Sequence, residues 1–125
     1  MKKHSEKNDP LSVKTLLFAI RIVNLSKYLM GEKKEFILSK QIIRSGTNPG
    51  AMIRESSQAE SGADFIHKLA IALKEISETK YWLELLQATK YISEKEFSSL
   101  YMDATEIAKL LTSSIKTKKR NLKQK

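Results

Sequence analysis

Hydrophobic residues recur three or four positions apart in four stretches of the chain, a spacing that places them on one side of an α-helix. The last stretch is the clearest. Ser93 and Glu96 have the spacing of a capping box, in which the side chain of each residue accepts a hydrogen bond from the backbone N–H of the other. The stripe that follows consists of Phe97, Leu100, Ala104, Ile107 and Leu111. We therefore predict a helix that begins after Ser93.

Two further helices also have start signals. Ser61 is followed three positions later by Asp64, and a hydrophobic seam then continues to about Thr89. Asp9 precedes Pro10, which suits the first helical position because proline has no N–H to leave unpaired there. This first helix should continue to about Met30 and stop at Gly31.

Residues 34–60 allow two interpretations. Pro49 would cost about 3 kcal/mol in a helix interior, so the segment is either two short helices joined by a turn or one helix kinked at Pro49. Small residues surround this proline and would let a neighbouring backbone come close. They are Ser45, Gly46, Gly50 and Ala51.

These elements predict an all-α fold, an antiparallel up-and-down four-helix bundle in a single domain. We expect a flexible N-terminus at residues 1–9, the bundle at residues 10–115 and a basic tail at residues 116–125. No hydrophobic run reaches the roughly 18 to 20 residues that span a bilayer, and we expect no secretion signal. The expected location is the cytoplasm, with no membrane partner.

The first helix carries two hydrophobic stripes where a bundle core needs one. Val13, Leu16, Ile20, Val23 and Met30 form the first stripe; Phe18, Ile22, Leu25 and Leu29 form the second. In the third helix, Trp82 and Leu85 also lie beside the main seam. We predict that the second stripe, Trp82 and Leu85 form a subunit interface, with Glu55, Glu75 and Glu78 making polar contacts there. Each part of this prediction has an alternative. The hydrophobic stripes can belong to a wide core face that leaves some hydrophobic residues exposed, and the glutamates can form salt bridges within the chain.

Charge is concentrated at the C-terminal end. The chain has a net charge of +9, and residues 116–125 hold six basic residues and no acidic one. Such a segment can neutralise phosphates without reading sequence, or it can be a solvated tail or a helix end that complements the helix dipole. The candidate nucleic-acid contacts, for RNA or DNA, are Lys40, Arg44, Arg54, Lys116, Lys118, Lys119, Arg120 and Lys123.

The residues do not favour catalysis. There is no cysteine, and the only histidines are His4 and His67. No glycine-rich phosphate loop is present, and the pair Glu75 and Glu78 lacks the histidine that a di-iron bundle needs. We expect a non-enzyme without metal or cofactor.

Several segments together resemble the family of 23S rRNA intervening-sequence proteins. They are residues 41–47, Gly50-Ala51, Arg54-Glu55, residues 59–61, 63–69 and 71–75, Glu78-Thr79, and residues 81–86. The resemblance covers about residues 11–115. It implies an antiparallel bundle, a ring-like homopentamer and no enzymatic activity. Some members are encoded within insertions in ribosomal RNA genes, and a related protein is the accessory subunit of diversity-generating retroelements.

Residues 48–52 depart from the family pattern, but the resemblance favours one continuous helix over residues 34–60.

We therefore expect a non-catalytic homopentameric scaffold that binds RNA or other nucleic acid with little sequence preference and steep salt dependence. The alternative is a protein–protein adaptor that does not contact nucleic acid and whose partner is a protein encoded nearby.

Overall fold

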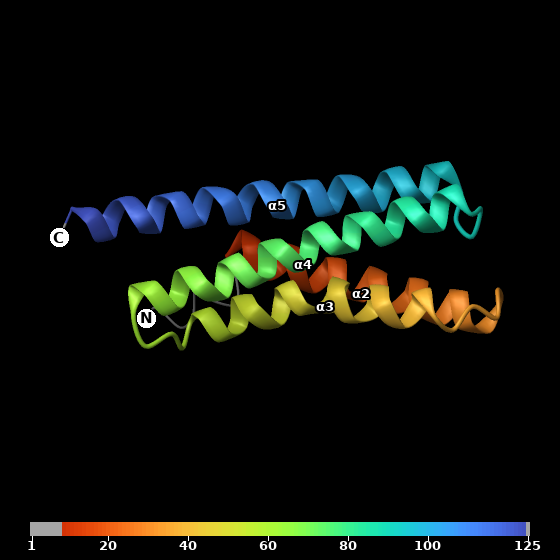
Figure 1. The fold of residues 1–125 in the computed structure, drawn as a ribbon, viewed down its shortest axis with the longest axis horizontal. Coiled ribbons are helices and arrows are strands. Elements are labelled where there is room, and N and C mark those ends of the chain that lie inside the picture. The colour runs from red at the N-terminus through yellow and green to blue at the C-terminus, as the bar shows by residue number, and fades with distance from the viewer. Residues whose placement is uncertain (1–8, 125) are drawn as a thin grey trace.

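The structure, a computed structural model, describes residues 9–124, which form four helices that run alternately up and down. The helices are α2 (Pro10–Gly31), α3 (Leu38–Ser56), α4 (Gly62–Ala88) and α5 (Glu94–Lys123). Each helix lies beside the next along the chain (Figure 1), and short loops join them. The predicted all-α four-helix bundle is confirmed.

Three of the four helices begin where the sequence predicts. The Asp9 carboxylate accepts a hydrogen bond from the Ser12 N–H at 2.9 Å, and Pro10 occupies the first turn. At α4, the Ser61 hydroxyl accepts from the Asp64 N–H at 3.1 Å. Ser93 accepts in the same way from Glu96 at the start of α5. Each cap satisfies a backbone donor that has no partner inside its helix.

The start of α3 differs from the prediction. We expected a helix from about Lys34, but α3 begins at Leu38. Lys34 has a φ of 54°, which a helical residue does not adopt. The Glu35 carboxylate then accepts hydrogen bonds from the backbone N–H groups of Ile37, Leu38 and Ser39 at 2.8 to 3.1 Å. A glutamate cap of this kind follows no simple sequence rule, so the prediction missed it.

Helix α3 is continuous through Pro49, in agreement with the single-helix interpretation. Pro49 is buried, and the Thr47 hydroxyl donates to the Ile43 carbonyl at 2.7 Å just before it. The helix ends at Ser56, earlier than the expected Glu60. There the Ser56 and Ser57 hydroxyls bond to the carbonyls of Ile53 and Arg54.

The core corrects the predicted use of α2. Phe18, Ile22, Leu25 and Leu29 were predicted to form a subunit interface, but they are 0 to 4% exposed and fill the centre of the bundle. They pack with one hydrophobic stripe from each of the other helices. The largest of these partners are Ile42 of α3, Leu69, Ile76, Leu83 and Leu86 of α4, and Leu100, Ile107 and Leu111 of α5. The buried stripe of α5, which also includes Ala104, is the one that the sequence predicts.

The small residues of α3 explain why this stripe of α2 faces inward. A Cβ atom built on Gly46 would lie only 2.8 Å from both Cγ1 and Cγ2 of Ile22. Only glycine therefore lets α2 approach α3 this closely at the level of Ile22. The predicted close approach at the small residues is confirmed at Gly46.

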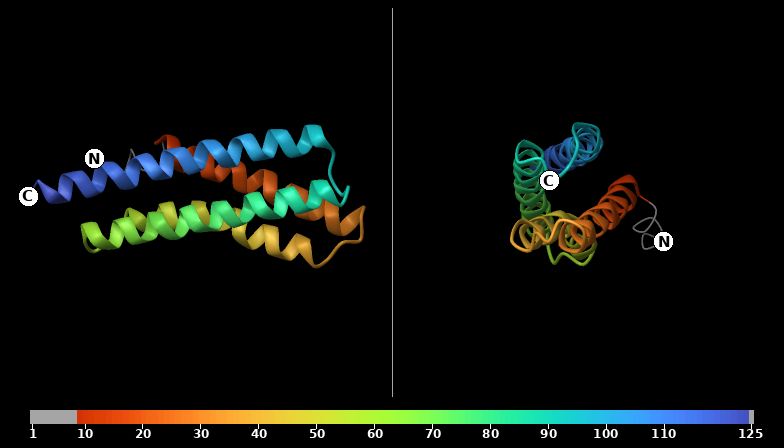
Figure 2. Two further views of the ribbon diagram at one scale, coloured as in Figure 1. Left: turned by 45° about the horizontal axis from the view of Figure 1, so that its top comes forward. Right: turned by 90° about the vertical axis from the view of Figure 1, so that its right-hand side faces the viewer.

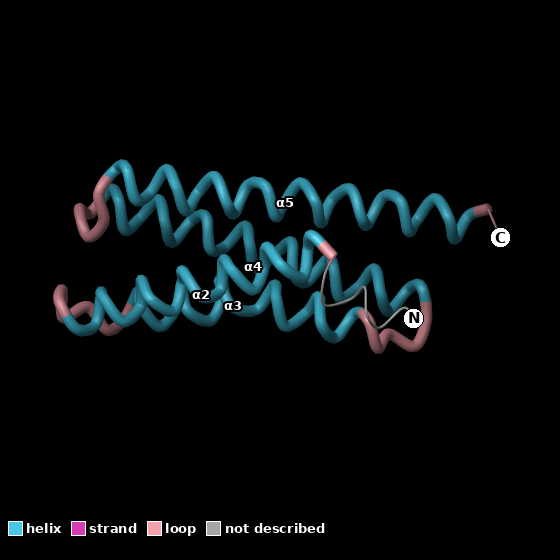
Figure 3. The backbone as a smooth tube through the Cα atoms, turned by 180° about the vertical axis from the view of Figure 1, so that it is seen from behind, coloured by secondary structure: helices cyan, strands magenta, loops and turns pink. Residues whose placement is uncertain are grey.

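The bundle is open along one side. Helices α2 and α5 make less extensive contact than the three pairs of consecutive helices, as the end-on view of Figure 2 shows. Helix α5 includes residues 116–123, the predicted basic tail, and extends past the other helices at its C-terminal end (Figure 3). Within residues 9–124, no helix is both long enough and apolar enough to cross a membrane.

Candidate functional site

The exposed hydrophobic residues of α2 form a ridge that we call the α2 crest. Its members are Val13, Leu16, Leu17 and Ile20, which are 40 to 57% exposed. Two ion pairs to α5 lie beside this crest: Lys14 with Glu106 at 3.2 Å, and Arg21 with Asp103 at 2.8 Å. Three of these four side chains, Val13, Leu16 and Ile20, belong to the stripe of α2 that was not predicted to form the interface.

The three acids predicted at a subunit interface make contacts within the chain. Glu55 pairs with Lys68 at 3.1 Å. Arg44 reaches from α3 to α4, where it lies 3.4 Å from Glu75 and 2.8 Å from Glu78.

The indole of Trp82 donates a hydrogen bond to the same Glu78 carboxylate at 3.0 Å. Trp82 and Leu85, which were predicted to lie at the interface, are partly buried. The ion pairs join α3 to α4, and the Trp82 hydrogen bond holds the shared carboxylate in place. Contacts within a single chain therefore account for these polar groups.

The candidate phosphate-binding residues do not form one cluster. Lys40 lies in the first turn of α3, at the end of the bundle opposite the C-terminal end of α5 (Figure 1). Arg44 is paired with two acids. Arg54 is exposed near the end of α3, and Lys118 lies 5.2 Å from the ring centre of Phe65. Lys119 and Lys123 are exposed on α5.

Two of the predicted residues, Lys116 and Arg120, line a groove between α4 and α5 that we call the α4–α5 groove. It has a volume of about 500 Å³. Its other cations are Lys80 from α4 and Lys109 from α5. The remaining lining residues are Thr105, Ala108, Thr112, Ser113 and Thr117. The groove thus combines four cations with four hydroxyl groups, and no carboxylate lines it.

Sequence reasoning missed Lys80 and Lys109. Lys109 could have been found, because it precedes Lys116 by seven residues and Arg120 by eleven, a spacing that keeps all three on one face of a helix. Lys80 had no such signal. Only the packing of α4 against α5 brings it to this face.

Lys80 also contacts an aromatic ring beside the groove. Its Nζ lies 4.8 Å from the ring centre of Tyr101. The Tyr101 hydroxyl donates to the Glu84 carboxylate at 3.1 Å. Burial, and then the hydrogen bond and the negative charge of Glu84, raise the pKa of Tyr101 above its usual 10.0.

The basic end of α5 is packed against α4. Leu122 lies over the first turn of α4, where a Cβ atom on Gly62 would approach its side chain to 2.6 Å. Lys118 covers Phe65 one turn earlier. These two contacts hold the last turns of α5 in place and so position Lys116 and Arg120 along the groove.

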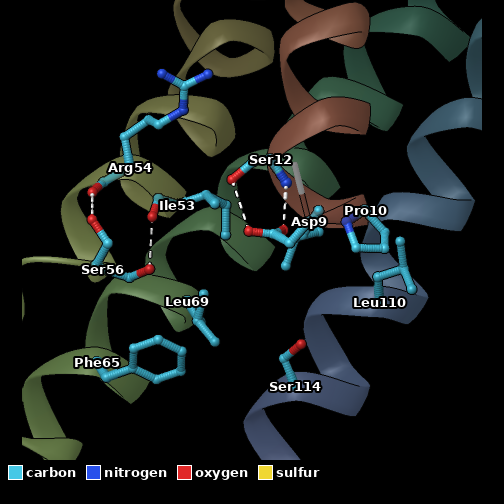
Figure 4. A pocket seen from close by; sticks show the side chains of 12 residues that line it. Asp9, Pro10, Ser12, Ile53, Arg54, Ser56, Phe65, Leu69, Leu110 and Ser114 are labelled. Carbon is cyan, nitrogen blue, oxygen red and sulfur yellow. Dashed lines mark hydrogen bonds between the residues drawn. The ribbon is translucent and has the colours of Figure 1, made fainter. Parts of the chain in front are cut away.

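A second hollow, the end cleft, lies where α2 begins and α3 ends (Figure 4). Its volume is about 500 Å³, and its hydrophobic walls are Ile53, Phe65, Leu69 and Leu110. The Arg54 guanidinium points away from it. The Asp9 carboxylate accepts hydrogen bonds from Ser12. Several of the polar groups around this cleft thus form hydrogen bonds at helix ends, with Asp9 at the start of α2 and Ser56 at the end of α3.

Residues 9–124 contain no group of three or more histidine, aspartate or glutamate side chains placed to hold a metal ion. His67 is exposed on α4, and His4 lies outside the described residues. Among the features that the described chain offers for recognition are the α2 crest, the end cleft and the α4–α5 groove.

Comparison with known proteins relates the chain to one family. A crystal structure of a protein of unknown function from the S23 ribosomal protein family of Bacteroides thetaiotaomicron is 58% identical in sequence. The similarity covers 89% of this chain and 98% of that one, with a TM-score of 0.85. The comparison with curated proteins finds no match. Residues 11–113 match the family described as 23S rRNA-intervening sequence protein. The chain belongs to this family of 23S rRNA-intervening sequence proteins.

Proposed function

We propose that the protein is a non-catalytic, homo-oligomeric scaffold that binds RNA through the C-terminal half of α5. The observation that carries this proposal is the separation of charge along that helix. After Glu106, α5 contains no acidic residue, whereas Lys109, Lys116, Arg120 and three further basic residues follow before it ends. Cations arranged in this way neutralise phosphates and release counterions, which favours binding to any nucleic acid.

Self-association is supported by the α2 crest. Its four hydrophobic side chains lie next to one another at helical spacing, and each of them is at least 40% exposed in the described chain. Burying hydrophobic surface contributes about 25 cal/mol per Å², so a second copy that covers the crest would be stabilised. A pentamer, as the family resemblance implies, would present five basic helix ends and increase the affinity for a long strand through avidity.

Two measurements on the full-length protein test this function. Native mass spectrometry gives the number of chains, and fluorescence anisotropy with labelled RNA gives the affinity at about 50 and 200 mM salt. We expect a closed oligomer and RNA binding that weakens steeply as salt rises. A monomer would contradict the oligomeric part of the proposal. Undetectable or salt-insensitive RNA binding would contradict the nucleic-acid part.

The second candidate function is a protein–protein adaptor, favoured by the end cleft. This cleft is walled by hydrophobic side chains and lies at the end of the bundle, where a partner protein could reach it. An adaptor would keep its partner when Lys116 and Arg120 are changed to glutamine, whereas RNA binding through α5 would weaken. The two functions therefore respond differently to the same variant.

A further inference from the structure

We propose that the α4–α5 groove holds the sugar–phosphate backbone of a single nucleic-acid strand and binds a duplex less tightly. This inference rests on the proposed RNA-binding function and adds to it the site and the form of the ligand. It also assigns a binding role to Lys80 and Lys109, which the sequence alone did not place in the site.

The groove has the chemistry of a phosphate-binding surface. Among the described residues, Lys80, Lys109, Lys116 and Arg120 form no ion pair with an acidic side chain. The nearest acid along α5, Glu106, pairs instead with Lys14 of α2. Cations and hydroxyl groups are the side chains that most often contact phosphate oxygens.

The cations of the groove form a line along α5. At 1.5 Å per residue, Lys116 lies about 10 Å along the helix from Lys109, and Arg120 lies about 6 Å further on. Thr112 and Ser113 lie between the first two cations. A small anion is held by groups that converge on one point, whereas a line of separated cations suits a polymer that carries a charge at regular intervals.

The spacing of the cations favours a flexible single strand. Eight of the nine lining residues belong to α5, so the row of cations lies along one helix and Lys80 flanks it from α4. A flexible strand can bend so that its phosphates reach each of these separated cations. A duplex is stiffer and holds its phosphates in a fixed helical arrangement.

The lining residues also explain why little sequence preference is expected. No asparagine, glutamine, aspartate or glutamate is among them, so the carboxamide and carboxylate groups that pair with adenine and cytosine edges are missing from the groove. The backbone of the strand is then the part that the groove contacts.

The test compares two forms of one RNA on the full-length protein. The probes are a fluorescein-labelled strand of about 20 nucleotides without self-complementarity, longer than the site of a typical single-strand binding fold, and the duplex that it forms with its complement. The groove variant carries Lys109→Gln and Lys116→Gln. The matched control carries Lys27→Gln and Lys95→Gln, which removes the same charge from exposed positions outside the groove lining and outside the C-terminal half of α5. Lys80→Gln changes the groove from the α4 side.

We expect the single strand to bind at least about tenfold more tightly than the duplex. For about four phosphate contacts, its affinity should fall about fiftyfold between 50 and 200 mM salt, because each contact adds about 0.7 to the logarithmic slope. The groove variant should lose about 1.4 of that slope and Lys80→Gln about 0.7, while the control loses much less. Circular dichroism verifies that each variant keeps its helical content.

Equal affinity for strand and duplex would overturn the inference and leave the proposed RNA-binding function intact. Equal loss of slope in the groove variant and in the control would also overturn it, because binding would then depend on total charge. Absence of RNA binding by the unmodified protein would overturn both the inference and the nucleic-acid part of the proposed function.

Discussion

Ile22 of α2 packs directly against Gly46 of α3, with no side chain between them. A Cβ atom at position 46 would lie 2.8 Å from two carbon atoms of Ile22, and Ile22 is fully buried. This contact sets the distance between the first two helices. It also determines which stripe of α2 enters the core.

Gly46→Ala should destabilise the bundle. Alanine is the better helix former by about 1 kcal/mol, but the added methyl group would force Ile22 or α3 to move, which typically costs about 1 to 3 kcal/mol. We expect a lower midpoint of urea unfolding with an unchanged slope.

Gly31→Ala is the matched control, because a Cβ atom at Gly31 meets nothing within 4 Å. This variant should unfold at the same or a higher urea concentration. A Gly46→Ala protein as stable as the Gly31→Ala protein would show that the contact with Ile22 does not limit the approach of α2 to α3.

The α2 crest should determine the oligomeric state. Replacing both Leu16 and Leu17 with glutamate leaves the core untouched but places two charges on the crest. Burying an unpaired charge is strongly unfavourable, so native mass spectrometry should show a shift from oligomer to monomer.

Ile37→Glu serves as the control for the crest, because Ile37 is 73% exposed but lies outside it. Its variant should form the same oligomer as the unmodified protein. An oligomer that survives the double substitution in the crest would place the subunit contact elsewhere on the surface.

Arg44 should contribute little to RNA binding, because Glu75 and Glu78 already neutralise it. Arg44→Gln is expected to lower stability by no more than about 1 kcal/mol, since the arginine side chain is more than half exposed. Its RNA affinity should stay close to that of the unmodified protein, whereas Lys116→Gln weakens binding. A larger loss of affinity in Arg44→Gln than in Lys116→Gln would return Arg44 to the binding site.

Tyr101 should make stability depend on pH in the alkaline range. Burial and Glu84 raise its pKa in the folded protein above 10.0, so the folded state holds the phenol proton more tightly than the unfolded state. The contribution is therefore fully present below pH 10.0 and is lost as pH rises through the raised pKa. The urea midpoint of unfolding should therefore fall as pH rises through this range. For Tyr101→Phe it should fall less steeply than for the unmodified protein. Identical pH profiles would show that Tyr101 has an ordinary pKa.

Helix starts illustrate how far local chemistry reaches. The predicted caps at Asp9, Ser61 and Ser93 involve residues only three positions apart, so their hydrogen bonds could be foreseen from spacing. The start of α3 was not foreseen, because glutamate is not among the preferred N-cap residues, although the Glu35 side chain bonds backbone N–H groups only two to four residues ahead. The candidate site shows a different limit, because it depends on contacts between helices. Lys116 and Arg120 were visible as a basic run, but Lys80 joins them only through the packing of α4 against α5.

The sequence by itself determined the four helices, their antiparallel bundle and the basic end of α5, because periodicity, caps and local charge are properties of neighbouring residues. It left two equally periodic hydrophobic stripes on α2, and the stripe predicted to form the interface proved to be the core. Only the tertiary structure decided between them, since the choice depends on the shape of the opposing helix, where Gly46 leaves room for Ile22.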